Sequence, residues 1–259
     1  MTDPFSTIDS SADPAKQYGV LQGRLERRYY RETLDWFFGL ILEHARPESF
    51  LEIGCGTGGL LEMFRGLVGG NVDAAVGVDY SMYVLRKTRG AIEGVELLPA
   101  DGRALPFADG SLGAAFAATV LVHARDPQRI VDEMARVVRP GGLVALLDQD
   151  FETAVLYPGD KDLTRRVLNA ASDFWSTGCI GRRLPDMLRR SGLRVADVKS
   201  RVRIDREFDQ GFFGRIRDWI VEGGFDREEA DRWLEELKRL APEVEFMFSR
   251  NFYTAIAIK

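Results

Sequence analysis

The stretch of sequence that decides the fold reads Phe50-Leu51-Glu52-Ile53-Gly54-Cys55-Gly56-Thr57-Gly58-Gly59. The apolar run 49–53 predicts a buried strand, and the pattern over 57–67 predicts a helix. Between them the chain turns through four glycines. Glycine adopts backbone dihedrals that other residues avoid, and it lets the backbone approach a ligand closely. The stretch therefore predicts a strand, a ligand-binding turn and a helix in succession.

Strands and helices continue to alternate beyond this turn. Strands are predicted at 74–78, 95–98, 112–120 and 143–147, and helices at 81–89 and 126–138. This alternation is typical of an α/β protein with a doubly wound parallel sheet. Right-handed crossovers place the loops after the first four strands along one edge, where sheets of this kind bind ligands.

The flanks of this region differ from it. Residues 1–20 are polar and contain Pro4 and Pro14, so they predict an irregular arm, and helical spacing between Leu21 and Ala45 predicts one or two helices. After residue 150, helical patterns cover 161–175, 182–191, 212–222 and 227–240. Alternating patterns at 193–204 and 245–258 predict two more strands.

Length, charge and composition exclude several classes of protein. The chain of 259 residues suits one α/β domain with an appended cap, and its net charge of −5 creates no field that favours nucleic acid. No apolar run approaches the ~18 residues of a membrane span, and the N-terminus lacks a signal-peptide layout, so the expected location is cytoplasmic. Cys55 and Cys179 are too few for a disulfide framework or a cysteine-based zinc site.

The glycines of the turn match a known fingerprint. Gly54, Gly56 and Gly59 fit the G-x-G-x-x-G pattern of dinucleotide-binding enzymes. Asp79 also lies where such an enzyme carries its ribose-binding acid. A nicotinamide enzyme is therefore one interpretation of the turn.

Two acidic residues favour a different ligand. Glu52 lies two residues before Gly54, beside the ligand-binding edge. Its anion there would repel a pyrophosphate but suits the ammonium group of a methionine moiety and a nearby sulfonium. Asp101 follows the third predicted strand, and its carboxylate can accept a hydrogen bond from the exocyclic amine of an adenine. The segments 105–112 and 137–142 then lead into the fourth and fifth strands. Together these features favour S-adenosylmethionine (SAM).

In this order the motifs resemble those of class I SAM-dependent methyltransferases of the ubiquinone and menaquinone biosynthesis type, and the likeness covers residues 49–150. The resemblance implies an α/β fold with a doubly wound, Rossmann-like sheet of seven strands in the order 3-2-1-4-5-7-6, the last strand antiparallel, and a helical lid. It implies SAM as cofactor, S-adenosylhomocysteine as product, and in-line methyl transfer to O, N or C of a small molecule. No metal is required.

The resemblance also implies a role for individual residues. The segment from Glu52 to Gly58 would wrap the methionine end, Asp79 would bind both ribose hydroxyls, and Asp101 would bind the adenine amine. The full implied set for SAM is Glu52, Gly54, Cys55, Gly56, Gly58, Asp79, Tyr80, Met82, Asp101, Gly102 and Thr119. In that set Tyr80 and Met82 lie against the adenine, with Gly102 close by. Thr119 and Val120 face the sulfonium.

The expected organisation is a single methyltransferase domain over residues 1–259. Residues 49–150 form the SAM-binding core, residues 1–45 an arm and helices that act as a lid, and residues 205–242 a helical insertion that caps the substrate. Aromatic residues outside the core either form the interior of the cap or line an enclosed apolar substrate pocket. They are Trp36, Phe37, Phe38, Phe151, Trp175, Phe212, Phe213, Trp219 and Phe225.

His123 is the candidate catalytic residue. It follows the fourth predicted strand, at the loop expected to face the methyl group. An imidazole, with an ordinary pKa of about 6.5, can accept the proton of an O–H or N–H nucleophile. The alternative is structural, since histidine at this place in the family often packs against or caps the next helix. The sequence leaves both roles open.

Three further features each have a functional and a structural interpretation. Asp148-Gln149-Asp150 closes the fifth predicted strand, where the carboxylates either bind a basic amine or act as bases, or else cap the strand and face water. The basic run from Arg182 to Arg206 either binds nucleic acid or forms an outer solvated face, and the interspersed acids favour the second. Cys55 is interpreted as a small turn residue, because no basic partner for a nucleophile lies nearby.

Two rival functions remain. A methyltransferase acting on RNA or protein is disfavoured by an acidic chain without a basic arm. A non-catalytic, SAM-binding regulatory protein is disfavoured because Glu52, Asp79 and Asp101 are all present. We therefore expect a small-molecule substrate and no nucleic-acid or membrane partner. The acceptor and the oligomeric state are not predicted.

Overall fold

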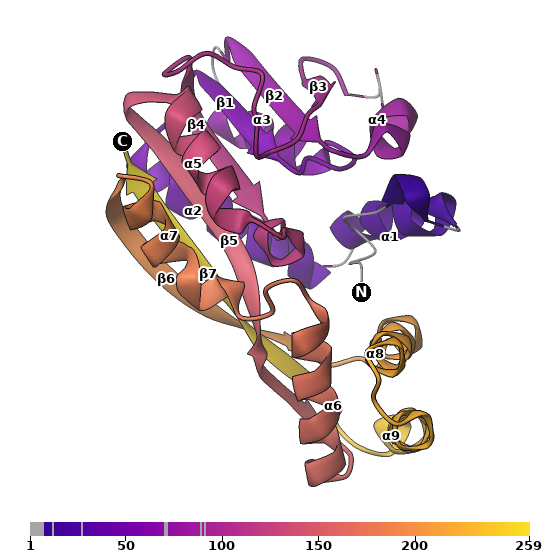
Figure 1. The fold of residues 1–259 in the computed structure, drawn as a ribbon. Coiled ribbons are helices and arrows are strands. Elements are labelled where there is room, and N and C mark those ends of the chain that lie inside the picture. Colours follow the sequence, from indigo (N-terminus) through magenta and orange to yellow (C-terminus); the bar gives the residue numbers. More distant parts are fainter. Residues whose placement is uncertain (1–7, 12, 27, 70–71, 89, 91) are drawn as a thin grey trace.

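The computed structural model describes all residues except 1–7, 12, 27, 70–71, 89 and 91, and the side chains of 24–29. Its seven-stranded sheet has the order β3-β2-β1-β4-β5-β7-β6 (Figure 1). The strands are β1 (Ser49–Ile53), β2 (Ala74–Asp79), β3 (Glu96–Pro99), β4 (Leu112–Ala118), β5 (Val138–Tyr157), β6 (Arg194–Asp205) and β7 (Met247–Ile258). Strands β1 to β5 pair in parallel, and β7 is antiparallel to β5 and β6. The predicted fold class and strand order are confirmed.

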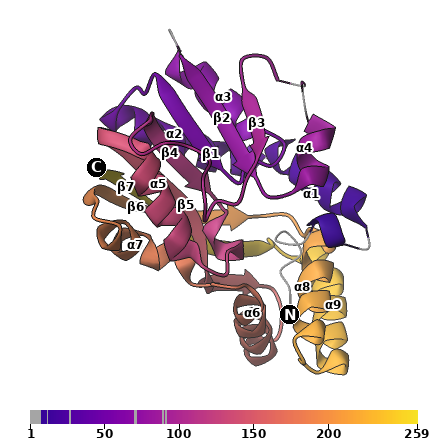
Figure 2. The ribbon, with the colours of Figure 1, turned by 45° about the horizontal axis from the view of Figure 1, so that its top comes forward.

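Helices cover both faces of the sheet, which explains why the central strands are apolar throughout. Every residue of β4 is buried, as expected for a parallel strand covered on both faces. On one face α2 (Arg28–His44) and α3 (Gly59–Val68) build a core with the sheet. On the other, α5 (Pro127–Val137) and α7 (Leu184–Arg190) do the same (Figure 2).

Strand β5 is much longer than the predicted segment 143–147. It extends to Tyr157, and after an irregularity between Asp150 and Val155 its pairing with β7 continues. The extension carries a second helical layer of α6 (Lys161–Phe174), α8 (Gln210–Glu222) and α9 (Arg227–Leu240), which share a core of their own. This layer packs against the extended ends of β5 and β7 (Figure 1). The sequence predicted an early end of β5 because Asp148 and Asp150 are charged. Their partners Val122 and Arg182 are distant in sequence, so the sequence pattern did not reveal that both acids are buried.

The N-terminal segment is also more ordered than expected. Residues 14–20, predicted to be irregular, belong to α1 (Pro14–Glu26), and Ile8–Ser10 form a short 3-10 helix, η1. Pro14 begins α1 at a position where the missing N–H costs nothing. The Asp13 carboxylate accepts a hydrogen bond from the Lys16 amide at 3.0 Å, which caps the helix. The prediction of an irregular arm was wrong for residues 14–20, and residues 1–7 and 12 lie outside the described residues.

The remaining short elements connect these layers. They are α4 (Met82–Thr88) and the 3-10 helices η2 (Leu121–His123), η3 (Ile180–Arg183) and η4 (Ala241–Glu243). Aspartates cap four of the longer helices through backbone amides, namely Asp126, Asp160, Asp209 and Asp226. Within the described part of the chain, no helix combines the length and apolarity needed to cross a membrane.

Candidate functional site

The glycine-rich turn after β1 is held by close packing and by Asp79. Gly54 has a φ of 66°, and a Cβ at this position would lie 2.6 Å from Cγ2 of Val120. The Asp79 carboxylate at the end of β2 accepts hydrogen bonds from the Gly56 amide and the Ser81 amide, each at 2.8 Å. The Asp79 side chain thereby fixes both the loop after β1 and the loop after β2. Any side chain larger than hydrogen at Gly54 would displace Val120.

A cavity of about 120 Å³, here called the inner cavity, lies over this turn. Among the predicted site residues, its wall includes Glu52, Gly54, Cys55, Gly56, Asp79, Thr119 and His123. Glu52 is only 1% exposed, and its Oε2 atom has no hydrogen-bond partner among the residues that the structure describes. Burial and the neighbouring Asp79 raise the pKa of Glu52 well above its ordinary value. A cation in the inner cavity would relieve this cost.

Cys55 in the same wall is not set up as a nucleophile. Its side chain is 4% exposed, and burial, together with Glu52 and Asp79, raises the pKa of the thiol. The reactive thiolate form is therefore disfavoured. This agrees with the interpretation of Cys55 as a small turn residue.

A second, outer cavity of about 390 Å³ adjoins the first. Asp79, Gly54, Val120 and His123 contribute to both walls. The outer wall adds three predicted residues, Tyr80, Asp101 and Gly102.

Two predicted residues, Gly58 and Met82, are not in either wall. A Cβ at Gly58 would contact Ile92 and Leu97, so this glycine serves packing. Met82 begins α4, and its amide donates a hydrogen bond to Asp9 at 2.9 Å.

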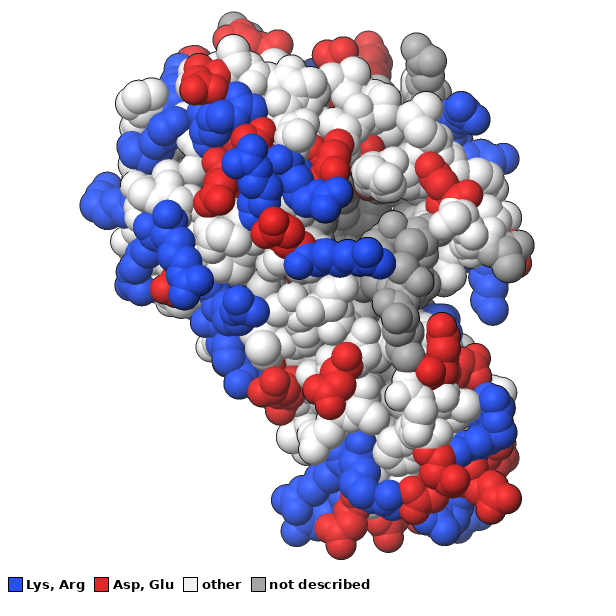
Figure 3. Space-filling view, viewed as in Figure 1, with Lys and Arg blue, Asp and Glu red and all other residues white. Residues whose placement is uncertain are grey.

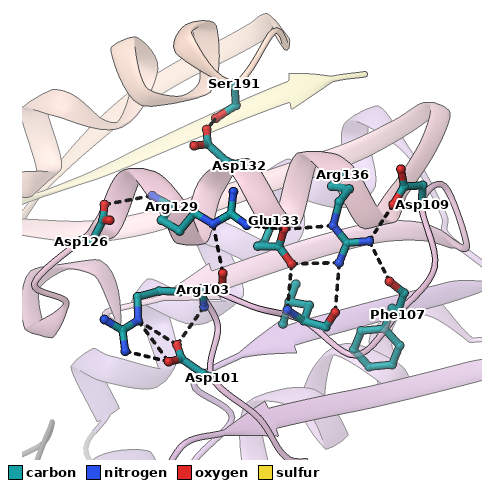
Figure 4. A network of polar contacts seen from close by, with 11 residues as sticks. Asp101, Arg103, Phe107, Asp109, Asp126, Arg129, Asp132, Glu133, Arg136 and Ser191 are labelled. Atoms are coloured by element: carbon teal, nitrogen blue, oxygen red, sulfur yellow. Dashed lines mark hydrogen bonds and ion pairs between the residues drawn. The ribbon is translucent and has the colours of Figure 1, made fainter.

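Asp101 is positioned by a polar network that joins its loop to α5 (Figure 4). Its carboxylate forms an ion pair with Arg103 at 2.7 Å, which holds the pKa of Asp101 below its ordinary value. Arg129 donates to the carbonyl of Arg103 at 3.1 Å, and the Glu133 carboxylate accepts from the Leu105 amide at 2.8 Å. The Arg103 amide, Nε and Nη2 all donate to the two Asp101 oxygens, so a further donor such as an amine would have to share or displace one of these bonds.

Thr119 and His123 lie at the end of β4, where the cavities meet. Thr119 has a φ of 57°, a conformation rare for a β-branched residue, and its hydroxyl is 3.2 Å from the hydroxyl of Tyr30. Such backbone strain persists where the surroundings impose it, often at functional sites. The His123 ring packs edge-on against Trp175, with centroids 5.1 Å apart.

A third cavity, here called the aromatic cavity, lies on the far side of these residues and measures about 80 Å³. It shares Tyr30, Thr119 and His123 with the inner cavity. Its described wall consists of Val20, Tyr30, Thr119, His123, Gln149, Phe151, Trp175, Arg203, Phe212, Arg215, Trp219, Arg250 and Phe252. Four aromatic residues singled out in the sequence therefore line a cavity, whereas Phe37, Phe38 and Phe213 belong to the cores.

The arginines of this wall were not predicted as site residues. Arg203 belongs to the basic run expected on an outer solvated face, yet its side chain is only 10% exposed. That expectation was wrong for Arg203. Arg250, on β7, is only 5% exposed, and the sequence did not predict it as a site residue. The sequence signal that could have identified Arg250 is a charged residue at an inward-facing position of the otherwise apolar strand β7.

Two acidic residues of β5, Asp148 and Asp150, face neither water nor the cavities, whereas Glu152 is exposed. Asp148 is fully buried and accepts hydrogen bonds from the amides of Val122 and Gln149 at 3.1 and 2.9 Å. Burial raises its pKa to about 6, although nearby His123 opposes the shift. Asp150, also fully buried, forms an ion pair with Arg182. The expectation of a solvated strand cap was wrong, because β5 continues through this segment.

The N-terminal segment closes over the cavities. Asp9 accepts hydrogen bonds from the Ser81 hydroxyl at 2.5 Å and from the Met82 and Tyr83 amides at 2.9 and 3.0 Å. Ile8 lines the inner cavity, next to the loop that Asp79 holds. Helix α1 lies between α4 and α8 in Figure 1. It contributes Leu21 to the inner cavity and Val20 to the aromatic cavity.

Comparison with known proteins gives the family. A model of the methyltransferase domain matches residues 51–146. A phosphatidylethanolamine N-methyltransferase of Cereibacter sphaeroides is 31% identical over 141 residues, which are 48% of this chain and 67% of that protein. An uncharacterized 37.1 kDa protein in a transposon of Streptomyces fradiae is 31% identical over 159 residues, or 60% of this chain and 46% of that protein. The chain thus spans about half the length of the latter relative.

The fold agrees with these matches. A solved structure of a SAM-dependent methyltransferase from Thermotoga maritima superposes with a TM-score of 0.57 at 16% identity, covering 99% of this chain and 100% of that one. These names do not single out the ubiquinone and menaquinone branch, which stays a prediction. The chain belongs to the class I SAM-dependent methyltransferases, with SAM as the cofactor.

Proposed function

We propose that this protein transfers the methyl group of SAM to an O, N or C atom of a small molecule bound in the aromatic cavity. The observation that carries the proposal is the wall shared by the inner and aromatic cavities, formed by Tyr30, Thr119 and His123. A donor methyl group and an acceptor atom placed on either side of this wall would approach each other there. A cavity lined by aromatic rings and a few polar groups suits a small-molecule ligand.

The residues of the inner and outer cavities fit SAM. The buried Oε2 of Glu52 lacks a partner, and the ammonium group of the methionine moiety would supply one. Asp79 lies in the wall of both cavities, where it would accept the ribose hydroxyls, and Asp101 would accept the adenine amine. When bound, SAM supplies an electrophilic methyl group on a sulfonium.

The chain contributes mainly by orienting the two reactants. Close packing of Gly54 against Val120 and the constrained backbone of Thr119 fix the wall between donor and acceptor. Holding two groups in line is worth roughly 7–11 kcal/mol of activation free energy. The N-terminal segment and α8 would exclude water once both ligands are bound.

His123 is the proposed general base for an acceptor that carries its proton on oxygen or nitrogen. It lines the inner, outer and aromatic cavities, so its ring lies where methyl donor and acceptor would meet. Asp148 lies near enough for the charges of the two groups to interact.

A labelling experiment tests the proposed function. The protein is incubated with SAM carrying a deuterated methyl group and, separately, with extracts of small metabolites, RNA and protein. We expect the label in small metabolites only, with Glu52→Gln as the inactive control. Label in RNA or protein would instead support a macromolecular substrate. SAM binding without transfer to any of the three would support a regulatory role.

A further inference from the structure

The charged side chains in the described wall of the aromatic cavity are all positive. Three of its wall residues are arginines, Arg203 from β6, Arg215 from α8 and Arg250 from β7. None of the described residues in this wall is acidic. Asp205 contacts Arg203 at 2.9 Å and Arg250 at 3.6 Å, but it lies outside the wall. A ligand in the cavity would therefore meet guanidinium groups and aromatic rings.

Arg250 is the most buried of the three cations. Its Nε donates a hydrogen bond to the side-chain oxygen of Gln149 at 2.9 Å. The guanidinium lies 5.5, 5.1 and 5.6 Å from the ring centroids of Phe151, Phe248 and Phe252. Ring faces attract a cation but carry no net charge to neutralise it. In a low-dielectric interior the positive potential of such a group acts strongly on a ligand.

The inner cavity has the opposite character, because Glu52 and Asp79 make it negative. This pairing suits a cationic methyl donor on one side of Thr119 and an anionic acceptor on the other. A cationic amine would be attracted to the inner cavity and repelled by the arginines. The charges of the two walls would thus sort donor and acceptor between the two cavities.

Resting on the proposed function, we infer that the acceptor is a planar, largely apolar molecule with an anionic group, of which an aromatic carboxylate is the simplest form. Its carboxylate is held by Arg250 and Arg215, since a guanidinium matches a carboxylate with two parallel hydrogen bonds. Its ring system packs on Trp175 and Trp219. The atom to be methylated then faces His123.

Binding of defined probes tests this inference without knowledge of the natural substrate. The probes are benzoate, naphthoate and anthracenecarboxylate, each with the matching carboxamide and the matching aryl methylamine. They are titrated into the protein saturated with S-adenosylhomocysteine, and the fluorescence of Trp175 and Trp219 in the cavity wall reports binding. We expect at least one carboxylate to bind about tenfold or more tightly than its amide and its amine.

Variants assign the preference to the cavity. Arg215→Gln and Arg250→Gln should each remove the preference for the acid while S-adenosylhomocysteine affinity is unchanged. Arg250 is buried, so the partly exposed Arg215 keeps the test valid if the Arg250 variant does not fold. Arg217→Gln is the matched control, because Arg217 lies on the same helix but pairs with Asp218 and Asp231 outside the wall.

Two results would overturn the inference. One is that amides or amines bind as tightly as the acids, or that no acid binds. The other is that Arg215→Gln and Arg217→Gln behave alike. Failure of the proposed function would look different, because the labelling experiment would then show no methyl transfer to small metabolites, whereas these titrations measure probe binding alone.

Discussion

Glu52 is a buried acid whose Oε2 atom lacks a partner, so it should cost stability when the donor is absent. Folding raises its pKa, and the folded protein therefore binds this proton more tightly than the unfolded chain does. The free energy of unfolding consequently falls as the pH rises above the ordinary carboxyl pKa. Removing the charge should reverse this loss.

We expect Glu52→Gln to raise the Tm of the ligand-free protein at neutral pH, with the difference shrinking as the pH falls towards the ordinary carboxyl pKa and vanishing below it. The same change should weaken SAM binding by about tenfold or more, because a charged hydrogen bond is lost. Thermal unfolding across pH, with and without SAM, measures both effects. A lower Tm with unchanged affinity would mean that Glu52 serves the fold alone.

The raised pKa values of Glu52 and Asp79 also predict how SAM binding responds to pH. A bound cation lowers both pKa values, so binding should release protons, and SAM affinity should rise with pH above the ordinary carboxyl range. Calorimetry in buffers of different ionisation enthalpy counts the protons released. The Glu52→Gln variant should release fewer protons than the parent when it binds SAM. Equal proton release by the parent and the variant would contradict this account of the inner cavity.

The two roles of His123 predict different kinetics. As a general base, its replacement in His123→Ala should lower turnover by at least about a hundredfold with SAM affinity nearly intact, and the parent rate should rise with pH through one histidine titration. As a structural residue packed against Trp175, its loss should lower the Tm, with a modest rate change and an unaltered pH profile. Turnover against pH for both proteins separates the two roles.

At the scale of elements, the N-terminal segment acts as the proposed lid. Among the described residues it contacts α4 through the Asp9 carboxylate, which bonds Ser81, Met82 and Tyr83, and through Tyr18, whose ring packs edge-on against Tyr83. Since loss of a helix-capping side chain costs about 0.5–2 kcal/mol, Asp9→Ala should speed SAM dissociation by about 2- to 30-fold. Stopped-flow displacement of SAM measures this rate.

Asp226→Ala is the matched control for the lid, because Asp226 caps α9 in the distant helical layer. It should reduce stability by a similar amount without changing SAM dissociation. If both variants release SAM at the parent rate, the N-terminal segment does not hold the donor, and the lid proposal fails.

Sequence patterns predicted some elements better than others for identifiable reasons. The bounds of β1 and of α9 were predicted residue for residue, since one is a short apolar run and the other a regular amphipathic pattern. The end of β5 was missed because Asp148 and Asp150 look solvent-exposed until their partners are known. Arg250 was missed because its neighbours, Phe151 and Gln149, are about a hundred residues away in the chain.

At the scale of the whole molecule, two cavities lined by residues of opposite charge meet at Tyr30, Thr119 and His123. The negative inner cavity is built from the segment that motifs reveal, whereas the positive aromatic cavity draws on α1, α8, β6 and β7. No short stretch of sequence contains the second cavity, so only the folded chain shows it. Basic and acidic residues are interspersed on the face shown in Figure 3, and the net charge is −5.

The residues of the inner and outer cavities are proposed to bind SAM, with Asp79 as a central contact. Calorimetry of SAM binding to Asp79→Asn tests this most directly. Asp73→Asn, an exposed position just before the same strand, is the control. We predict that Asp79→Asn lowers SAM affinity by about 10- to 150-fold while Asp73→Asn binds like the parent, which should prefer SAM to NAD. Unchanged SAM affinity in Asp79→Asn, or tighter binding of NAD by the parent, would contradict the account.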